Sequence, residues 1–158
     1  MTTLAINREG IAADTRVVTG GSYWHENKVF RVGNSLLATA GDGFGCLAFL
    51  AWYQSPRRNP LELQKQFVEH DRDSVIIFEL NPGGIHAWNG WGYPAKLNDD
   101  CYAGGSGGMA ALEAMRRGAT PEEAVRSAIQ HDENSGSPIQ VEWLLPPELL
   151  PKRRKRKG

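Results

Sequence analysis

The sequence of 158 residues has only two cysteines, four histidines and no net charge, and it contains no long apolar run. Cys46 and Cys101 lack the CxxC spacing of a zinc site or a disulfide framework, so both are expected to be small core residues. The histidines also lack ligand spacing, so neither a metal nor another cofactor is expected. No apolar segment approaches the ~20 residues that span a bilayer, and the N-terminus does not have the pattern of a signal peptide. A cytoplasmic protein without a membrane contact is therefore predicted.

Charge is unevenly distributed along the chain. Lys152 to Lys157 are six consecutive basic residues, and the rest of the chain has 12 basic against 18 acidic residues, a net charge of −6. Because like charges repel, residues 147–158 are expected to form a disordered C-terminal tail that follows a single domain of residues 1–146. This tail is the one feature that favours nucleic acid, and a solvated tail is the preferred interpretation, so a nucleic-acid partner is not expected.

Strands and paired helices alternate along the sequence. Extended segments are predicted at 2–6, 11–14, 28–32, 36–40, 74–80, 85–88, 101–103 and 139–145. Helices are predicted at 43–54, 59–70, 109–117 and 120–131, the last with a capping box from Thr120 to Glu123. Residues 89–100 and 104–108 are predicted to be loops. Blocks of strands interrupted by helix pairs predict an α+β fold, a four-layer αββα sandwich of two antiparallel sheets.

The first predicted hairpin has a geometric consequence. If Arg8 and Glu9 form a two-residue loop, Thr3 faces Asp14, and a three-residue loop shifts this pairing by one position. In both cases the start of the chain is brought close to Asp14.

A series of short motifs then follows in order along the chain. They are Thr2-Thr3, Ala12 to Arg16, Lys28-Val29, Ala40-Gly41, Gly105-Ser106-Gly107 and Asp132 to Gly136. This order resembles the proteasome β-subunit family and its simpler bacterial relative HslV, which are N-terminal nucleophile (Ntn) hydrolases. The resemblance spans nearly the whole domain, and the family's αββα sandwich agrees with the element order. The family's glycine pair after Ala40 is replaced here by Gly41-Asp42-Gly43.

The resemblance implies a threonine-type endopeptidase with Thr2 as its nucleophile. A threonine hydroxyl needs a base, and an N-terminal threonine carries one in its α-amine, whose ordinary pKa is about 7.7–8.0. Met1 must be removed first, because an amide nitrogen cannot act as a base. Thr2 is a small second residue, so removal by methionine aminopeptidase is expected.

The other predicted site residues surround this nucleophile. Lys28 is expected to lower the pKa of the Thr2 hydroxyl and amine, and Asp14 to hold the Lys28 ammonium. The backbone N–H of Gly41 is expected to stabilise the oxyanion. A second group is expected to hydrogen-bond the amine: Ser106, Asp132 and Ser135. Within residues 19–27, substrate binding is predicted at Thr19, Gly21 and Tyr23.

The resemblance also implies a homo-oligomeric ring that encloses the active sites, takes polypeptide substrates and has an unfolding ATPase as a candidate partner. Two alternatives remain open. A catalytically inactive, proteasome-like scaffold or interaction protein would retain Met1. An amidase acting on a small substrate would use the same nucleophile without an enclosing ring.

Overall fold

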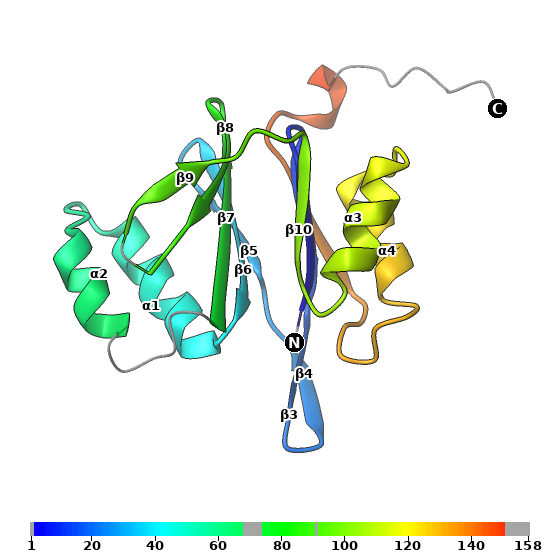
Figure 1. Ribbon diagram of the computed structural model, residues 1–158, viewed down its shortest axis with the longest axis horizontal. Helices are drawn as coiled ribbons and strands as arrows, with labels where there is room; N and C mark the ends of the chain where they lie inside the picture. The colour runs from blue at the N-terminus through cyan, green and yellow to red at the C-terminus, as the bar shows by residue number, and fades with distance from the viewer. Residues whose placement is uncertain (1, 68–73, 91, 151–158) are drawn as a thin grey trace.

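Two antiparallel sheets face each other, and a pair of helices lies on the outer side of each (Figure 1). The computed structural model describes residues 2–67, 74–90 and 92–150. The predicted four-layer αββα sandwich is confirmed. Among these residues, no helix has the length and apolar character needed to cross a membrane.

The first sheet has the strand order β10-β1-β2-β11 and the second the order β5-β6-β7-β8-β9. The strands of the first are β10 (Cys101–Gly105), β1 (Thr3–Asn7), β2 (Gly10–Asp14) and β11 (Ile139–Trp143). Those of the second are β5 (Val29–Val32), β6 (Ser35–Gly41), β7 (Val75–Asn81), β8 (Gly84–Trp88) and β9 (Pro94–Lys96). Helices α3 (Gly108–Arg116) and α4 (Pro121–Ala128) pack on the first sheet, and α1 (Gly43–Gln54), with α2 (Pro60–Phe67) beside it, on the second.

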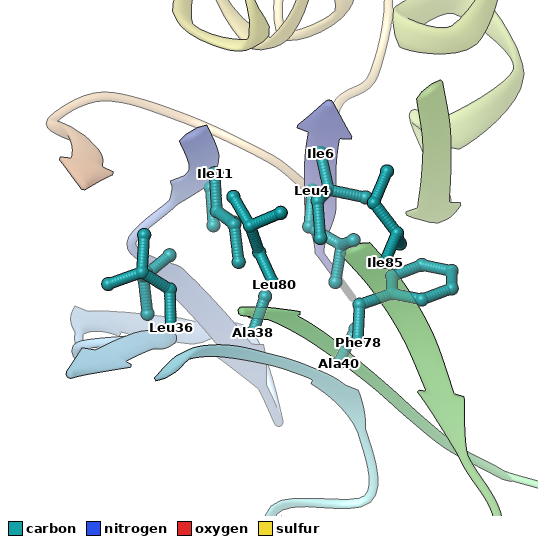
Figure 2. Packing of buried hydrophobic residues seen from close by; sticks show 11 residues of the cluster. Leu4, Ile6, Ile11, Leu36, Ala38, Ala40, Phe78, Leu80 and Ile85 are labelled. Atoms are coloured by element: carbon teal, nitrogen blue, oxygen red, sulfur yellow. The ribbon is translucent and has the colours of Figure 1, made fainter. Parts of the chain in front are cut away.

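Apolar side chains fill all three interfaces between the four layers. The two sheets meet through large residues of β1, β2, β6, β7 and β8, as Figure 2 shows. In β1, Leu4 and Ile6 point into this central layer, whereas Ala5 belongs to the layer under α3 and α4. A strand buried on both faces does not alternate between apolar and polar residues. Here it alternates between large and small ones, which lets the helices approach the sheet closely.

Several local predictions are confirmed. Helix α1 has the predicted bounds, and Thr120 and Glu123 form the reciprocal capping box. The β1–β2 hairpin has the two-residue loop, since Leu4 pairs with Ala13 and Ile6 with Ile11.

Other predictions need correction. The predicted loop at 89–100 contains the short strand β9, and Gly104 and Gly105 continue β10 instead of beginning a loop. Helix α4 ends at Ala128 and not near His131, and helix α2 ends at Phe67; the predicted extension of α2 to 70 lies outside the described residues. The prediction of a tail from 147 onwards stays a prediction, because the basic run at 152–157 lies outside the described residues; residues 147–149 form a 3-10 helix.

A separate hairpin was not predicted as strands. It consists of β3 (Arg16–Thr19) and β4 (Ser22–His25), and it extends beyond the sandwich beside the N-terminus (Figure 1). All four residues of β4 are exposed. Because the strand has no buried face, its sequence lacks the alternation of apolar and polar residues by which a strand is recognised.

A buried carboxylate, Glu79 on β7, joins parts of the second sheet to α1. Its side chain accepts hydrogen bonds from Ser35 Oγ at 2.6 Å, Tyr53 Oη at 2.9 Å, Asn81 Nδ2 at 2.9 Å and Trp88 Nε1 at 2.6 Å. Burial acts to raise the pKa of Glu79, but the four donors outweigh it and lower the pKa below its ordinary value.

We expect Glu79→Gln to destabilise the fold by about 1–3 kcal/mol at pH 7, because an amide nitrogen would face hydrogen-bond donors. A depressed folded-state pKa stabilises the fold above the unfolded pKa of 4.5 and ceases to do so as pH falls through the folded value. Urea unfolding at several pH values should therefore show the difference between wild type and variant shrinking below about pH 4. An equal difference at pH 7 and pH 3 would contradict this account.

Candidate active site

The start of β1 lies between two polar groups that come from distant parts of the chain. Thr2 immediately precedes β1 and is 6% exposed, and Thr3 is fully buried. The Thr3 backbone N–H donates to Asp14 Oδ1 at 2.8 Å, so the predicted proximity of the chain start to Asp14 is observed.

The first group is centred on Asp14, which is completely buried at the end of β2. Its Oδ1 accepts from Thr3 N and, at 3.1 Å, from Lys28 Nζ. Its Oδ2 accepts from Arg16 N at 3.1 Å and Gly136 N at 3.2 Å. Four donors therefore compensate the desolvation of this carboxylate, as a buried charge requires.

Lys28 lies directly before β5, and its side chain is only 7% exposed. Its backbone N–H donates to Gln140 Oε1 at 3.0 Å, and its ammonium donates to Asp14 and, at 2.6 Å, to the Arg16 carbonyl oxygen. Desolvation lowers the pKa of Lys28, and the charge of Asp14 and the hydrogen bond to it oppose that shift. An ammonium has three donors, and contacts within the described chain account for two.

The second group is centred on Asp132 in the loop after α4. Ser106 Oγ donates to Asp132 Oδ2 at 2.6 Å and Ser135 Oγ to the same oxygen at 2.5 Å. Ser106 Oγ also lies 3.4 Å from the Thr2 carbonyl oxygen. Desolvation acts to raise the pKa of Asp132, but hydrogen bonds from Ser106, Ser135 and Asn134 hold it below its ordinary value. Asp132 is therefore a carboxylate at neutral pH.

Two glycines allow the β10–α3 connection to pass against the chain start. Gly105 has φ +83°, and a Cβ there would overlap the Thr2 carbonyl oxygen. A Cβ at Gly107 would overlap Thr3 Oγ1. The two glycines of the Gly-Ser-Gly motif thus let the backbone pass close to Thr2 and Thr3, which places Ser106 beside Thr2; a residue with a Cβ could not approach as closely.

Thr2, Lys28 and Gly41 line one cavity of about 110 Å³. Gly41 ends β6 with φ +104°, and a Cβ there would overlap the Ser74 carbonyl oxygen, so this position also requires glycine. The other lining residues are mostly apolar: Val17, Glu26, Asn27, Phe30, Thr39, Ala40, Gly43, Cys46, Leu47 and Leu50.

The structure brings together Thr2, Asp14, Lys28, Gly41, Ser106, Asp132 and Ser135, but not the three residues predicted to bind substrate. Thr19, Gly21 and Tyr23 lie at or near the tip of the β3–β4 hairpin, Tyr23 is 66% exposed, and none of them lines the cavity. From the segment 19–27, Glu26 and Asn27 line it instead.

Sequence reasoning did not single out several residues that line the cavity or contact the predicted site residues. Gly43, Cys46, Leu47 and Leu50 have the i, i+3, i+4, i+7 spacing of one helix face, and α1 presents this face to the cavity. Thr3 was predicted only to pair with Asp14, yet its hydroxyl lies 2.8 Å from Ser135 Oγ.

Comparison with known proteins gives matches in structure alone: no protein-family model and no curated protein matches the sequence. BPH from Thiobacillus denitrificans has a TM-score of 0.71 and 24% identity, covering 91% of this chain and 99% of that one. The structure of the same protein in complex with epoxomicin has a TM-score of 0.69 and 24% identity, covering 91% of this chain and 100% of that one.

Two further similar structures carry family names. Eukaryotic HslV from Trypanosoma brucei has a TM-score of 0.64 at 19% identity, covering 90% of this chain and 98% of that one. Anbu, an ancestral β-subunit, from Yersinia bercovieri has a TM-score of 0.64 at 13% identity, covering 90% of this chain and 81% of that one. The resemblance stated from the motifs is thereby confirmed at the level of the fold: this chain has the Ntn-hydrolase fold of HslV and the proteasome β-subunits.

Proposed function

We propose that this protein is a threonine peptidase whose nucleophile is the hydroxyl of Thr2. The observation that carries the proposal is that Thr2 lines a cavity together with Lys28, a buried ammonium held by the fully buried Asp14. Ion pairs buried this deeply are costly to desolvate, and a lysine with a perturbed pKa that lines a cavity is a candidate functional residue.

In the proposed reaction, Thr2 Oγ adds to the carbonyl carbon of a peptide bond. The hydroxyl proton passes to the free α-amine of Thr2 and then to the departing amide nitrogen, leaving an ester on Oγ. Water hydrolyses this ester with the amine again as base, which releases the acyl product and restores Thr2. The positive charge of Lys28 favours the deprotonated hydroxyl, and the Gly41 N–H is the proposed donor to the oxyanion.

The composition of the cavity supports a preference for substrates with an apolar side chain beside the scissile bond. Its wall contains Val17, Phe30, Cys46, Leu47 and Leu50, and a volume of about 110 Å³ accommodates a side chain of moderate size. Burial raises the pKa of Cys46 to about 11, so its thiol is neutral and is part of the apolar wall. Lys28 is already paired with Asp14, so an acidic substrate side chain is not expected to be favoured.

The test is intact mass and N-terminal sequencing before and after reaction with two peptidyl epoxyketones, one with a leucine-like and one with a glutamate-like side chain at the reactive end. We expect a chain that starts at Thr2, gains one leucine-type probe and reacts at least about tenfold more slowly with the acidic probe, a difference of about 1.4 kcal/mol in barrier. Retained Met1, or a free Thr2 that never reacts, would favour the scaffold alternative.

We also propose that the protein acts as a homo-oligomer. Val18, Tyr23 and Trp24 on the β3–β4 hairpin and Phe44 and Leu47 on α1 expose large apolar surfaces. An isolated two-stranded hairpin is only marginally stable in water. We therefore propose that a neighbouring subunit packs against the exposed apolar side chains of the β3–β4 hairpin. Light scattering should give a mass several times 17.4 kDa, whereas a monomer that cleaves small amides would favour the amidase alternative.

A further inference from the structure

The residue after the proposed nucleophile, Thr3, contacts both polar groups of the site. Its backbone N–H donates to Asp14 Oδ1, the same oxygen that Lys28 reaches. Its hydroxyl lies 2.8 Å from Ser135 Oγ and 3.3 Å from Asp132 Oδ2. The next positions of β1, Leu4 and Ala5, lie in apolar layers, whereas the Thr3 hydroxyl is buried among polar side chains.

The direction of the hydrogen bonds follows from counting protons. Asp132 is a carboxylate and can only accept, so the single Ser135 hydroxyl proton is used in the 2.5 Å bond to Asp132 Oδ2. Ser135 Oγ must then accept in its contact with Thr3, and Thr3 Oγ1 is the donor. The result is a directed chain from Thr3 to Ser135 to Asp132.

We propose that Thr3 is a positioning residue whose hydroxyl occupies acceptor capacity of the Ser135–Asp132 pair, which Ser106 connects to Thr2 by its contacts with Asp132 Oδ2 and the Thr2 carbonyl oxygen. Acceptors near an amine favour its charged ammonium form, which cannot take a proton. By donating into the pair, Thr3 reduces that stabilisation and keeps more of the Thr2 amine neutral. The inference rests on the proposed function, in which this amine is the general base.

The test compares Thr3→Val, which keeps the branched shape and removes the hydroxyl, with Thr3→Ser, which keeps the hydroxyl. The readout is the pH midpoint of the second-order rate of acylation by a β-lactone probe, with N-terminal sequencing to verify a Thr2 start. We expect Thr3→Val to raise the midpoint by a few tenths to about one unit, since one hydrogen bond is lost, and Thr3→Ser to leave it unchanged.

The charged and titratable groups of the site are the same in both variants. They come from β2, β3, the segment between β4 and β5, the loop after α4, and α1: Asp14, Arg16, Glu26, Lys28, Asp132 and Cys46. A difference between the valine and serine variants therefore reports the hydroxyl itself.

Thr15→Val is the matched control. Thr15 is also buried, and its hydroxyl donates at 2.8 Å to the Pro138 carbonyl oxygen, so it anchors the end of the same loop without touching Asp132 or Ser135 in any described contact. We expect this variant to lose stability without a change in the pH midpoint. A loop-anchoring role alone would predict similar behaviour for Thr3→Val.

A folded Thr3→Val protein with the wild-type midpoint would overturn the proposal. If Thr3→Val does not fold, Thr3→Ala removes the same hydroxyl with a smaller side chain, and a wild-type midpoint in that variant would overturn the proposal as well. Failure of the proposed function has a different appearance: the wild-type protein itself would not be acylated.

Discussion

Replacing Thr2 by alanine is expected to abolish peptide cleavage and probe labelling while leaving the fold intact. Removal of a catalytic nucleophile costs on the order of 10⁴–10⁶ in rate, and no other group of the cavity replaces it in the proposed mechanism. Alanine is also a small second residue, so we expect Met1 to be removed from the variant as from the wild type, which leaves a free α-amine in both. A difference between wild type and Thr2→Ala therefore reports the loss of the hydroxyl and not a difference in N-terminal processing.

The matched control for this prediction is Thr2→Ser, which keeps a hydroxyl and a free amine. We expect the serine variant to retain activity within about two orders of magnitude and to gain one probe mass, because the same proton transfer remains available. Cleavage of a denatured protein, followed by mass spectrometry, measures both variants. Full activity in Thr2→Ala would remove Thr2 from the mechanism and redirect attention to other hydroxyls of the site.

The second large effect is expected from the Asp14–Lys28 pair. Lys28→Met leaves the Asp14 carboxylate fully buried without its ammonium partner, which typically costs about 3–5 kcal/mol of stability. The three backbone donors to Asp14 remain, so the protein is expected to fold in spite of this loss. Labelling of Thr2 should slow by about 10²–10³-fold or more, because a preorganised charge is missing from the site.

A double-mutant cycle with Asp14→Asn separates stability from chemistry. The double variant should be less destabilised than the sum of the two single variants by about 1–3 kcal/mol, because it leaves no unpaired buried charge. Its labelling rate should remain low. Urea unfolding and the rate of probe labelling measure the two quantities on the same preparations.

An exposed ion pair provides the control for the loss of a salt bridge as such. Arg126 lies 2.6 Å from Glu122 on α4, with side chains 61% and 40% exposed. Arg126→Met should change stability by less than about 0.5 kcal/mol and leave labelling unchanged, as surface pairs contribute little. If Lys28→Met behaved like Arg126→Met, the Asp14–Lys28 pair would have no special role in the site.

Local patterns in the sequence determined a large part of the fold. Apolar segments, Ser55-Pro56 and the Thr120–Glu123 capping box predicted the helices, because capping and helix termination depend on residues a few positions apart. The hairpin loop of Arg8 and Glu9 paired Thr3 with Asp14 for the same reason, since a short turn sets the register of its two strands. Sequence signals failed where an element was short or exposed, as in β9 and the β3–β4 hairpin.

The tertiary structure alone decided how the site is assembled. Gly136 and Ser135 reach Asp14 and Thr3 across more than 120 positions of sequence, and Lys28 is buried because β2, β3 and β11 surround it. It also decided that α1, and not the tip of the hairpin with Tyr23, forms the wall of the cavity. The sequence alone identifies which side chains could react, because the chemistry of a hydroxyl, an amine or a carboxylate depends on the residue type. Their burial, hydrogen-bond direction and pKa arise from segments that meet only when the sheets and helices pack.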